Sequence, residues 1–135
     1  MGKFIRGGTV TGAVVIIGCL AASLSTTAAA APSGAADFAS HCAGCHSLQP
    51  GKNGVGPSLA GVYGRTSGGA PGYSYSHALQ NAHLVWNDQD LEKFLQNPSS
   101  VAPGTKMFVS VPDAATRQQI IAYLKDPAQQ SASAK

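Results

Sequence analysis

The sequence is poor in charge: only 11% of its 135 residues are Asp, Glu, Lys or Arg, and the formal net charge is +3. So weak a positive balance does not predict a nucleic-acid-binding surface, which needs clustered basic side chains. Aromatic residues make up 7%, and much of the 44% hydrophobic content is alanine, so a core built from side chains alone would be thin. No stretch sustains an alternation of apolar and polar residues, which predicts few or no strands.

Cysteine is also scarce, and two of the three cysteines fall in one motif, Cys42-Ala43-Gly44-Cys45-His46. Cys-x-x-Cys-His is the attachment signal for c-type haem. Two thiols three positions apart lie on one face of a helical turn, from which both can form thioethers with the two vinyl groups of the porphyrin. The imidazole of His46 then falls under the iron, where it is a good axial ligand. The motif predicts one covalently attached haem c per chain.

Two other kinds of site also use Cys-x-x-Cys, namely thioredoxin-like redox pairs and zinc sites. The first requires a βαβ context, and the second requires a further Cys or His pair at matching spacing. The remaining cysteine is Cys19, in an apolar leader, and His41, His77 and His83 show no paired spacing. The sequence therefore favours haem, whose buried faces would also supply the apolar area that the core lacks.

Residues 1–31 are predicted to be a signal peptide. Lys3 and Arg6 open the chain, and no further charge follows in this segment. Residues 10–20 are apolar enough for the h-region of a secretory signal, and residues 28–31 offer the small side chains that a signal peptidase requires.

Two alternatives for this leader remain open. Ile16-Ile17-Gly18-Cys19 resembles a lipoprotein processing box, with Cys19 as the lipidated residue, and the uncharged run is also long enough to stay as a membrane anchor. All three interpretations place the haem domain outside the cytoplasmic membrane, where bacteria attach haem covalently to exported chains. We therefore expect a periplasmic protein, either free or tethered through its N-terminus.

The remainder divides into a haem domain, residues 32–127, and a small polar tail, residues 128–135, which we expect to be frayed. A first helix is predicted from Ala35 into the haem motif, with Phe38 on the same face as the first thiol. Glycine and proline then interrupt every regular pattern as far as Gly72, which predicts a long loop. Such a loop is unusual in a small domain, but a flat cofactor gives it something to wrap around.

Two later helices are predicted from their caps and apolar stripes. The first covers residues 88–96, with Asn87 as N-cap and Pro98 as a barrier to continuation. The second begins after Asp113 as N-cap and ends near Lys125. Its apolar face consists of Ile120, Ile121, Tyr123 and Leu124. The expected fold is all-α, with three main helices and long loops.

Together these features resemble the class I cytochromes c, most closely the mitochondrial and bacterial cytochrome c2-like branch, from Gly34 to about Lys125. The matching motifs are Gly34 and Phe38 on the first helix, Gly56-Pro57, Gly61-Val62-Tyr63-Gly64-Arg65, Ala70-Pro71-Gly72-Tyr73-Ser74-Tyr75 and Trp86. The resemblance implies three main helices and long loops wrapped around one covalently bound haem. It also implies that Gly34 and Phe38 cross the last helix.

The resemblance assigns roles to several residues around that haem. The carbonyl of Pro57 would accept the imidazole N–H of His46 and so fix its orientation. Arg65, Tyr75 and Trp86 would bind the haem propionates, since they offer a fixed cation, a phenol and an indole N–H.

The second axial ligand is implied in the same way. Pro103-Gly104-Thr105-Lys106-Met107 looks like the ligand loop of the family, and Met107 and Met1 are the only methionines. Thr105 would help to hold an inner propionate. The resemblance thus assigns the iron ligands as His46 and Met107, a pair that raises the reduction potential.

The sequence departs from the family pattern at two places beside this loop. Phe94 stands where many relatives have a tyrosine whose hydroxyl contacts the methionine sulfur. Ser99 and Ser100 stand where mitochondrial members carry lysines beside the exposed haem edge. The first departure bears on the reduction potential, and the second on the partner.

The leading functional hypothesis is therefore a monomeric one-electron carrier, not an enzyme. Its partners would be redox proteins, such as a membrane donor complex and a terminal oxidase or reductase of a respiratory chain. Two alternatives stay open: a haem subunit of a larger dehydrogenase or oxidase, and a haem peroxidase. The peroxidase would require an open iron position and a distal acid or base, for which His77 and His83 are the only spare histidines in the loops after the haem motif.

Overall fold

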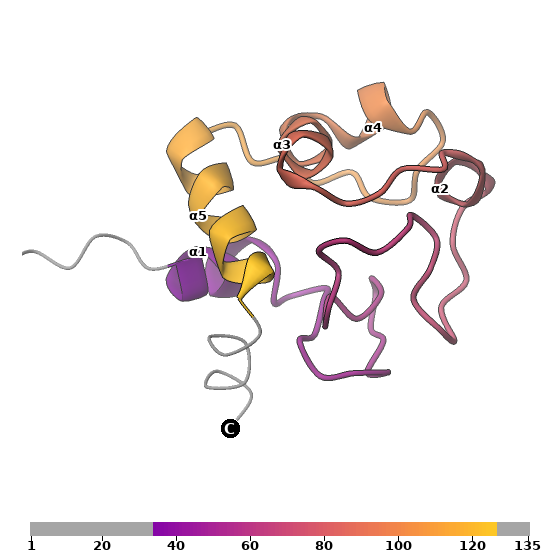
Figure 1. The fold of residues 1–135 in the computed structure, drawn as a ribbon, viewed down its shortest axis with the longest axis horizontal. Helices are drawn as coiled ribbons and strands as arrows, with labels where there is room; N and C mark the ends of the chain where they lie inside the picture. Colours follow the sequence, from indigo (N-terminus) through magenta and orange to yellow (C-terminus); the bar gives the residue numbers. More distant parts are fainter. Residues whose placement is uncertain (1–33, 127–135) are drawn as a thin grey trace, which may run out of the picture.

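The computed structural model describes residues 34–126, and within them the chain forms five helices and no strand (Figure 1). The helices are α1 (Gly34–His41), α2 (His77–Asn81), α3 (Asp88–Gln96), α4 (Pro98–Val101) and α5 (Ala114–Lys125). In this range extended segments pair only at an isolated bridge between Thr66 and Val85. The all-α prediction is thereby confirmed.

The predicted leader, residues 1–31, and the predicted tail, residues 128–135, lie outside the described part of the chain. Among the helices of residues 34–126, none is long and apolar enough to span a bilayer.

The two later helices have the caps that the sequence predicted. Asn87 accepts a hydrogen bond from the backbone N–H of Asp90 at 2.9 Å, and α3 covers Asp88–Gln96 as expected. Asp113 accepts from the N–H of Thr116 at 2.7 Å and so begins α5. Each cap satisfies a donor that the helix itself leaves free.

Helix α1 crosses α5 at very short range, as the resemblance implied (Figure 1). Gly34 makes this possible, because a Cβ atom there would collide with the carbonyl oxygen of Gln119 and lie 2.7 Å from the Cβ of Tyr123. One turn later, the rings of Phe38 and Tyr123 pack with centroids 5.6 Å apart. The helix begins at Gly34, one residue before the predicted start.

Two short helices, α2 and α4, were not predicted. In α4, Pro98 ends α3 but occupies the first helical position of a new turn, which Asn97 caps by accepting from the N–H of Ser100 at 3.2 Å. In α2, the Oγ of Ser76 caps the N–H of Leu79 at 3.3 Å. Helices of four and five residues are too short to show an apolar period.

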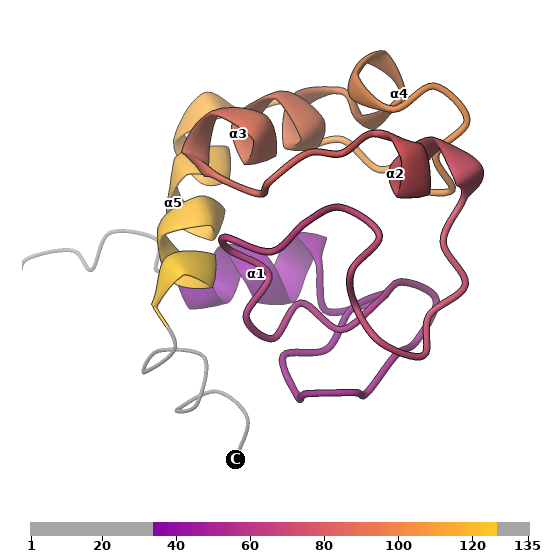
Figure 2. The same cartoon turned by 45° about the vertical axis from the view of Figure 1, so that its right-hand side comes forward.

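The chain between α1 and α2 is a long irregular loop that faces α3 and α4 across the molecule (Figure 2). Backbone hydrogen bonds fasten it to the segment before α3. Gly64 donates to the carbonyl of Trp86 at 2.7 Å, Trp86 donates to Arg65 at 3.0 Å, and Ser67 donates to Leu84 at 2.8 Å. The predicted loop is thus held at its edge by a short ladder of backbone bonds.

Three side chains tie this loop to the start of α3 and the end of α5. The hydroxyl of Tyr63 donates to Asp88 Oδ2 at 2.6 Å, and Lys125 Nζ lies 3.0 Å from both carboxylate oxygens. The hydrogen bond from Tyr63 is the largest cause that holds the pKa of Asp88 below its ordinary value of 3.8, and the hydrogen bond from Lys125 is the second. The same contact raises the pKa of Lys125.

These contacts predict an acid-sensitive stability. Because the pKa of Asp88 is lowered by folding, its contribution is complete above the unfolded value of 3.8 and is lost as the pH falls through the folded value. We expect Asp88→Asn to lower the free energy of unfolding at neutral pH, and the difference from the native chain to shrink below about pH 4. Urea unfolding at a series of pH values measures this, with Asp90→Asn as control, because Asp90 is in the same turn but bonds Asn87. A difference that persists unchanged into strong acid would contradict it.

Candidate haem site

One apolar cavity brings together all of the site residues that the sequence predicted. It lies between the long loop on one side and α3, α5 and the segment after α4 on the other. Its lining includes Cys42, Cys45, His46, Pro57, Arg65, Tyr75, Trp86, Thr105 and Met107. Residues as far apart in the sequence as Cys42 and Met107 therefore share one surface.

The two cysteines lie in the turn that continues α1. Cys42 donates its backbone N–H to the carbonyl of Phe38 at 2.8 Å, and His46 donates to Cys42 at 2.9 Å. Burial, and secondarily the neighbouring Cys45, raises the pKa of the Cys42 thiol to about 11. The surroundings thus favour the protonated thiol over the thiolate. Within residues 34–126 no three His, Cys, Asp or Glu side chains lie together as a cluster that could hold a metal ion.

The imidazole of His46 is fixed on its outer side. Its Nδ1 lies 2.8 Å from the carbonyl oxygen of Pro57, and since a carbonyl only accepts, Nδ1 carries the proton. The lone pair of Nε2 is then available to a ligand, and His46 lines the cavity. Gly56 leaves room for the ring, because a Cβ there would lie 2.6 Å from Nδ1 and 2.8 Å from Nε2.

Another part of the cavity lining is a tight turn that carries Met107. Thr105 donates its N–H to the carbonyl of Ala102 at 2.9 Å, and its buried Oγ1 accepts from the N–H of Met107 at 3.3 Å. Lys106 Nζ donates to the carbonyl of Ser74 at 2.9 Å and so joins this turn to the long loop. The Met107 side chain is half-buried and lines the cavity.

Polar groups line the cavity where the sequence predicted the propionates. Arg65 uses its two terminal nitrogens on the carbonyls of Ala60 and Ser58, both at 3.0 Å, and its Nε is buried without a hydrogen-bond partner among the described residues. The hydroxyl of Tyr75 accepts from the N–H of Ala70 at 3.2 Å, which leaves its own proton for another acceptor. Trp86 is buried beside Phe94, with ring centroids 5.0 Å apart.

Much of the lining is apolar and was not assigned to the site from the sequence. Leu91 and Leu95 come from α3, and Ile120 and Leu124 from α5. The sequence indicates that these two stripes are core faces, but it contains no signal that both stripes face the same cavity. Three exposed apolar members of the lining were missed entirely, because nothing in their sequence context distinguishes them. They are Val55, Phe108 and Val109.

These observations fit a porphyrin. A flat apolar group would contact the leucine and isoleucine side chains, Nε2 of His46 would face its iron, and the unpaired Nε of Arg65 would meet an acidic substituent. The fold and the site together define a small all-α haem protein that is joined to its cofactor at the end of the first helix. The chain belongs to the cytochrome c family, whose sequence model matches residues 31–126. It is accordingly a haem electron carrier with covalently attached haem c.

Individual relatives agree with this assignment. A cytochrome c from Euglena viridis is 54% identical over 89 residues, which are 65% of this chain and 87% of that protein. Cytochrome c2 iso-2 from Magnetospirillum fulvum is 47% identical over 85 residues, 62% of this chain and 88% of that protein. The structure of cytochrome cH from Methylobacterium extorquens superposes with a TM-score of 0.63 at 46% identity, covering 68% of this chain and 93% of that one.

The packing of Gly56 on His46 gives a second prediction. In Gly56→Ala the added methyl group overlaps the imidazole, which must turn away from the carbonyl of Pro57. We expect a loss of about 1–3 kcal/mol in the free energy of unfolding, as for other over-packed sites. Urea denaturation of the haem-containing protein measures it. The matched control is Gly44→Ala, where a Cβ meets nothing within 4 Å. Equal stability of the two variants would show that the ring does not lie against Gly56.

Proposed function

We propose that this chain carries single electrons through one haem c whose iron is held between Nε2 of His46 and the sulfur of Met107. The observation that carries the proposal is the 2.8 Å contact between His46 Nδ1 and the Pro57 carbonyl. The proton on Nδ1 leaves the lone pair of Nε2 free to bind iron, and His46 and Met107 both line the cavity. The bound haem would supply the couple between ferrous and ferric iron, and the protein would keep both ligands in place in either state.

In this proposal Pro57 orients His46, and Arg65, Tyr75, Trp86 and Thr105 accommodate the propionates. Arg65 would do so through Nε alone, since its terminal nitrogens already bind two carbonyls. The proton of the Tyr75 hydroxyl would be donated to a propionate oxygen. Phe94 also lines the cavity, so the hydroxyl that a tyrosine would direct at the methionine sulfur is replaced by a hydrogen atom.

An electron carrier agrees better with this arrangement than a peroxidase does. A peroxidase would need an open iron position with a distal acid or base nearby. Neither His77 nor His83 is among the residues that line the cavity, and both are exposed. The chain would thus act by transferring electrons and not by turning over a bound substrate.

We further propose a periplasmic location and redox-protein partners, with the haem domain spanning residues 32–127 as a monomer after removal of the leader. The support is the signal-like segment of residues 1–31 and the likeness to a bacterial cytochrome c2 and a bacterial cytochrome cH. A membrane tether through the N-terminus and assembly as a subunit of a larger complex are the alternatives. Native mass spectrometry of the purified protein distinguishes them by the cleavage site and any attached lipid.

The mouth of the cavity suggests how a partner would dock. Phe108 is 82% exposed and Val55 78% exposed, and Val109 lies beside them in the cavity lining. Of the basic side chains, Lys106 lines the cavity and is engaged with the carbonyl of Ser74, and Lys52 is exposed but is not part of the lining. The mouth is therefore mainly apolar and fits an apolar surface on a redox partner.

The assignment of Met107 is tested by Met107→Ala. The ferric native protein should show the weak near-infrared band of a sulfur–iron bond, and the variant should lose it. The reduced variant should bind carbon monoxide, because the sixth position is open, and its reduction potential should fall. Phe108→Ala is the control, since it changes the neighbouring exposed side chain and leaves the sulfur in place. A Met107→Ala spectrum identical to that of the native protein would refute the assignment.

The apolar mouth predicts weakly salt-dependent docking. Removal of Lys3 and Arg6 with the leader reduces the net charge from +3 to +1. Electrostatically steered partners associate at about 10⁸–10⁹ M⁻¹s⁻¹ and slow steeply as salt rises, whereas apolar contact should be slower and nearly independent of salt. Stopped-flow reduction by the native donor across a salt series measures this. Phe108→Ala should lower the rate by a similar factor at every salt concentration, and a steep fall with salt in the native protein would point to a charged docking face elsewhere.

A further inference from the structure

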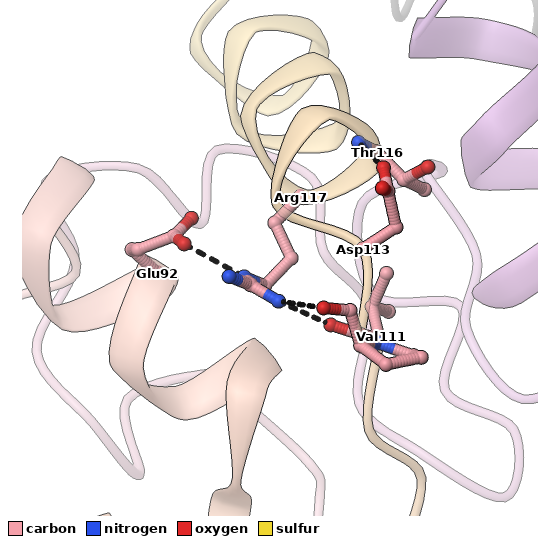
Figure 3. Close-up of polar contacts among 6 residues, drawn as sticks. Glu92, Val111, Asp113, Thr116 and Arg117 are labelled. Atoms are coloured by element: carbon pink, nitrogen blue, oxygen red, sulfur yellow. Dashed lines mark hydrogen bonds and ion pairs between the residues drawn. The ribbon is translucent and has the colours of Figure 1, made fainter.

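Arg117 is a charged residue in the interior that the site described above does not use. Its side chain lies on α5 and is 6% exposed, although arginine is almost never so deeply buried without partners. Figure 3 shows the guanidinium between Glu92 on α3 and the chain segment that leads into α5. The groups that surround Arg117 must therefore stabilise its buried charge.

The guanidinium makes three short contacts. Its Nε donates to Glu92 Oε1 at 2.7 Å, and its Nη1 donates to the carbonyls of Val111 and Pro112, each at 2.7 Å (Figure 3). Contacts from an ionised donor are stronger than those between neutral groups. Arg117 thus binds the backbone of two consecutive residues.

Val111 and Pro112 are the first residues after Met107 that hydrogen bonds hold in place. Phe108, Val109 and Ser110 are exposed and make no hydrogen bonds within residues 34–126. Val111 is 2% exposed, and its N–H donates to the carbonyl of Leu95 at 2.8 Å. On the C-terminal side, the position of Met107 therefore depends on the anchor four residues further along the chain.

Glu92 keeps the guanidinium in the orientation that this anchor needs. Its Oε1 binds Nε of Arg117, while its Oε2 is buried and has no hydrogen-bond partner within the described range. The Glu92 side chain is 33% exposed, and its ion-pair partner is Arg117. A planar guanidinium bound at one edge presents its other edge in a fixed direction. Through Glu92 and Arg117, helices α3 and α5 are both joined to residues 111 and 112.

We propose that Arg117 is a positioning residue for Met107: by holding the carbonyls of Val111 and Pro112, it keeps the loop of residues 107–112 closed over the haem and the thioether on the iron. This role rests on the proposed ligation by Met107. Loss of Arg117 would free the loop on its C-terminal side, so that Met107 would leave the iron more readily and other ligands would take its place.

The test measures how easily an added ligand displaces Met107. Imidazole is titrated into the ferric native protein and into Arg117→Met, and loss of the near-infrared sulfur–iron band gives the dissociation constant. We expect imidazole to bind Arg117→Met about tenfold more tightly, as the loss of charge-assisted hydrogen bonds to the loop would produce. Arg117→Lys should have an intermediate effect, because an ammonium cannot reproduce the two-edged contact. If Arg117→Met does not fold, Arg117→Lys takes its place in the titration.

Two further variants separate positioning from general stability. Phe38→Leu weakens the crossing of α1 and α5, away from the ligand loop, and should lower the urea midpoint without tightening imidazole binding. Glu92→Gln removes the ion pair but leaves the two carbonyl contacts, so its effect on imidazole binding should be smaller than that of Arg117→Met.

If Arg117→Met and Phe38→Leu bind imidazole more tightly in proportion to their loss of stability, the proposal is overturned, because the loop then opens only with general unfolding. Unchanged imidazole binding in a folded Arg117→Met overturns it as well. Failure of the ligand assignment gives a different result, since the native protein itself would then lack the near-infrared band.

Discussion

The orientation of one imidazole ring is the constraint on which the rest of the structure depends. The backbone N–H of His46 is held by Cys42 in the turn after α1, and its Nδ1 is held by the carbonyl of Pro57. Gly56 allows the loop to approach within contact distance of the ring. With its backbone and its ring both held, His46 would keep one geometry toward a haem iron in either oxidation state, as rapid transfer of single electrons requires. The long loop therefore sets the orientation of the His46 ring, even though it has no regular structure.

Some of this could be predicted from the sequence because the signals are local. The haem motif, the caps at Asn87 and Asp113, and the apolar stripes of α3 and α5 each lie within a few residues, and the structure has them as expected. The short helices α2 and α4 could not be predicted, because four or five residues do not complete an apolar period.

The less predictable features depend on partners distant in sequence. Arg65 was expected to face a propionate, and the sequence did not indicate that its terminal nitrogens bind the carbonyls of Ser58 and Ala60. An irregular loop leaves such carbonyls in need of donors, and the sequence does not say which donor will serve them. The pairing of Arg117 with Glu92 was missed for a related reason, since charged residues on amphipathic helices are ordinarily exposed.

The crossing of α1 and α5 also has a consequence for how the chain folds. Gly34 and Tyr123 lie near opposite ends of the described residues, so their contact closes a loop of about 90 residues, and the entropic cost of closure must be met before the contact forms. Contacts between such distant residues slow folding when they are numerous. A haem already attached at Cys42 would offer an apolar surface to Ile120 and Leu124 while the chain is still unfolded. It would thereby make the contact between the two ends of the chain form sooner. In kinetic terms, the cofactor would be part of the folding nucleus before it becomes part of the redox site.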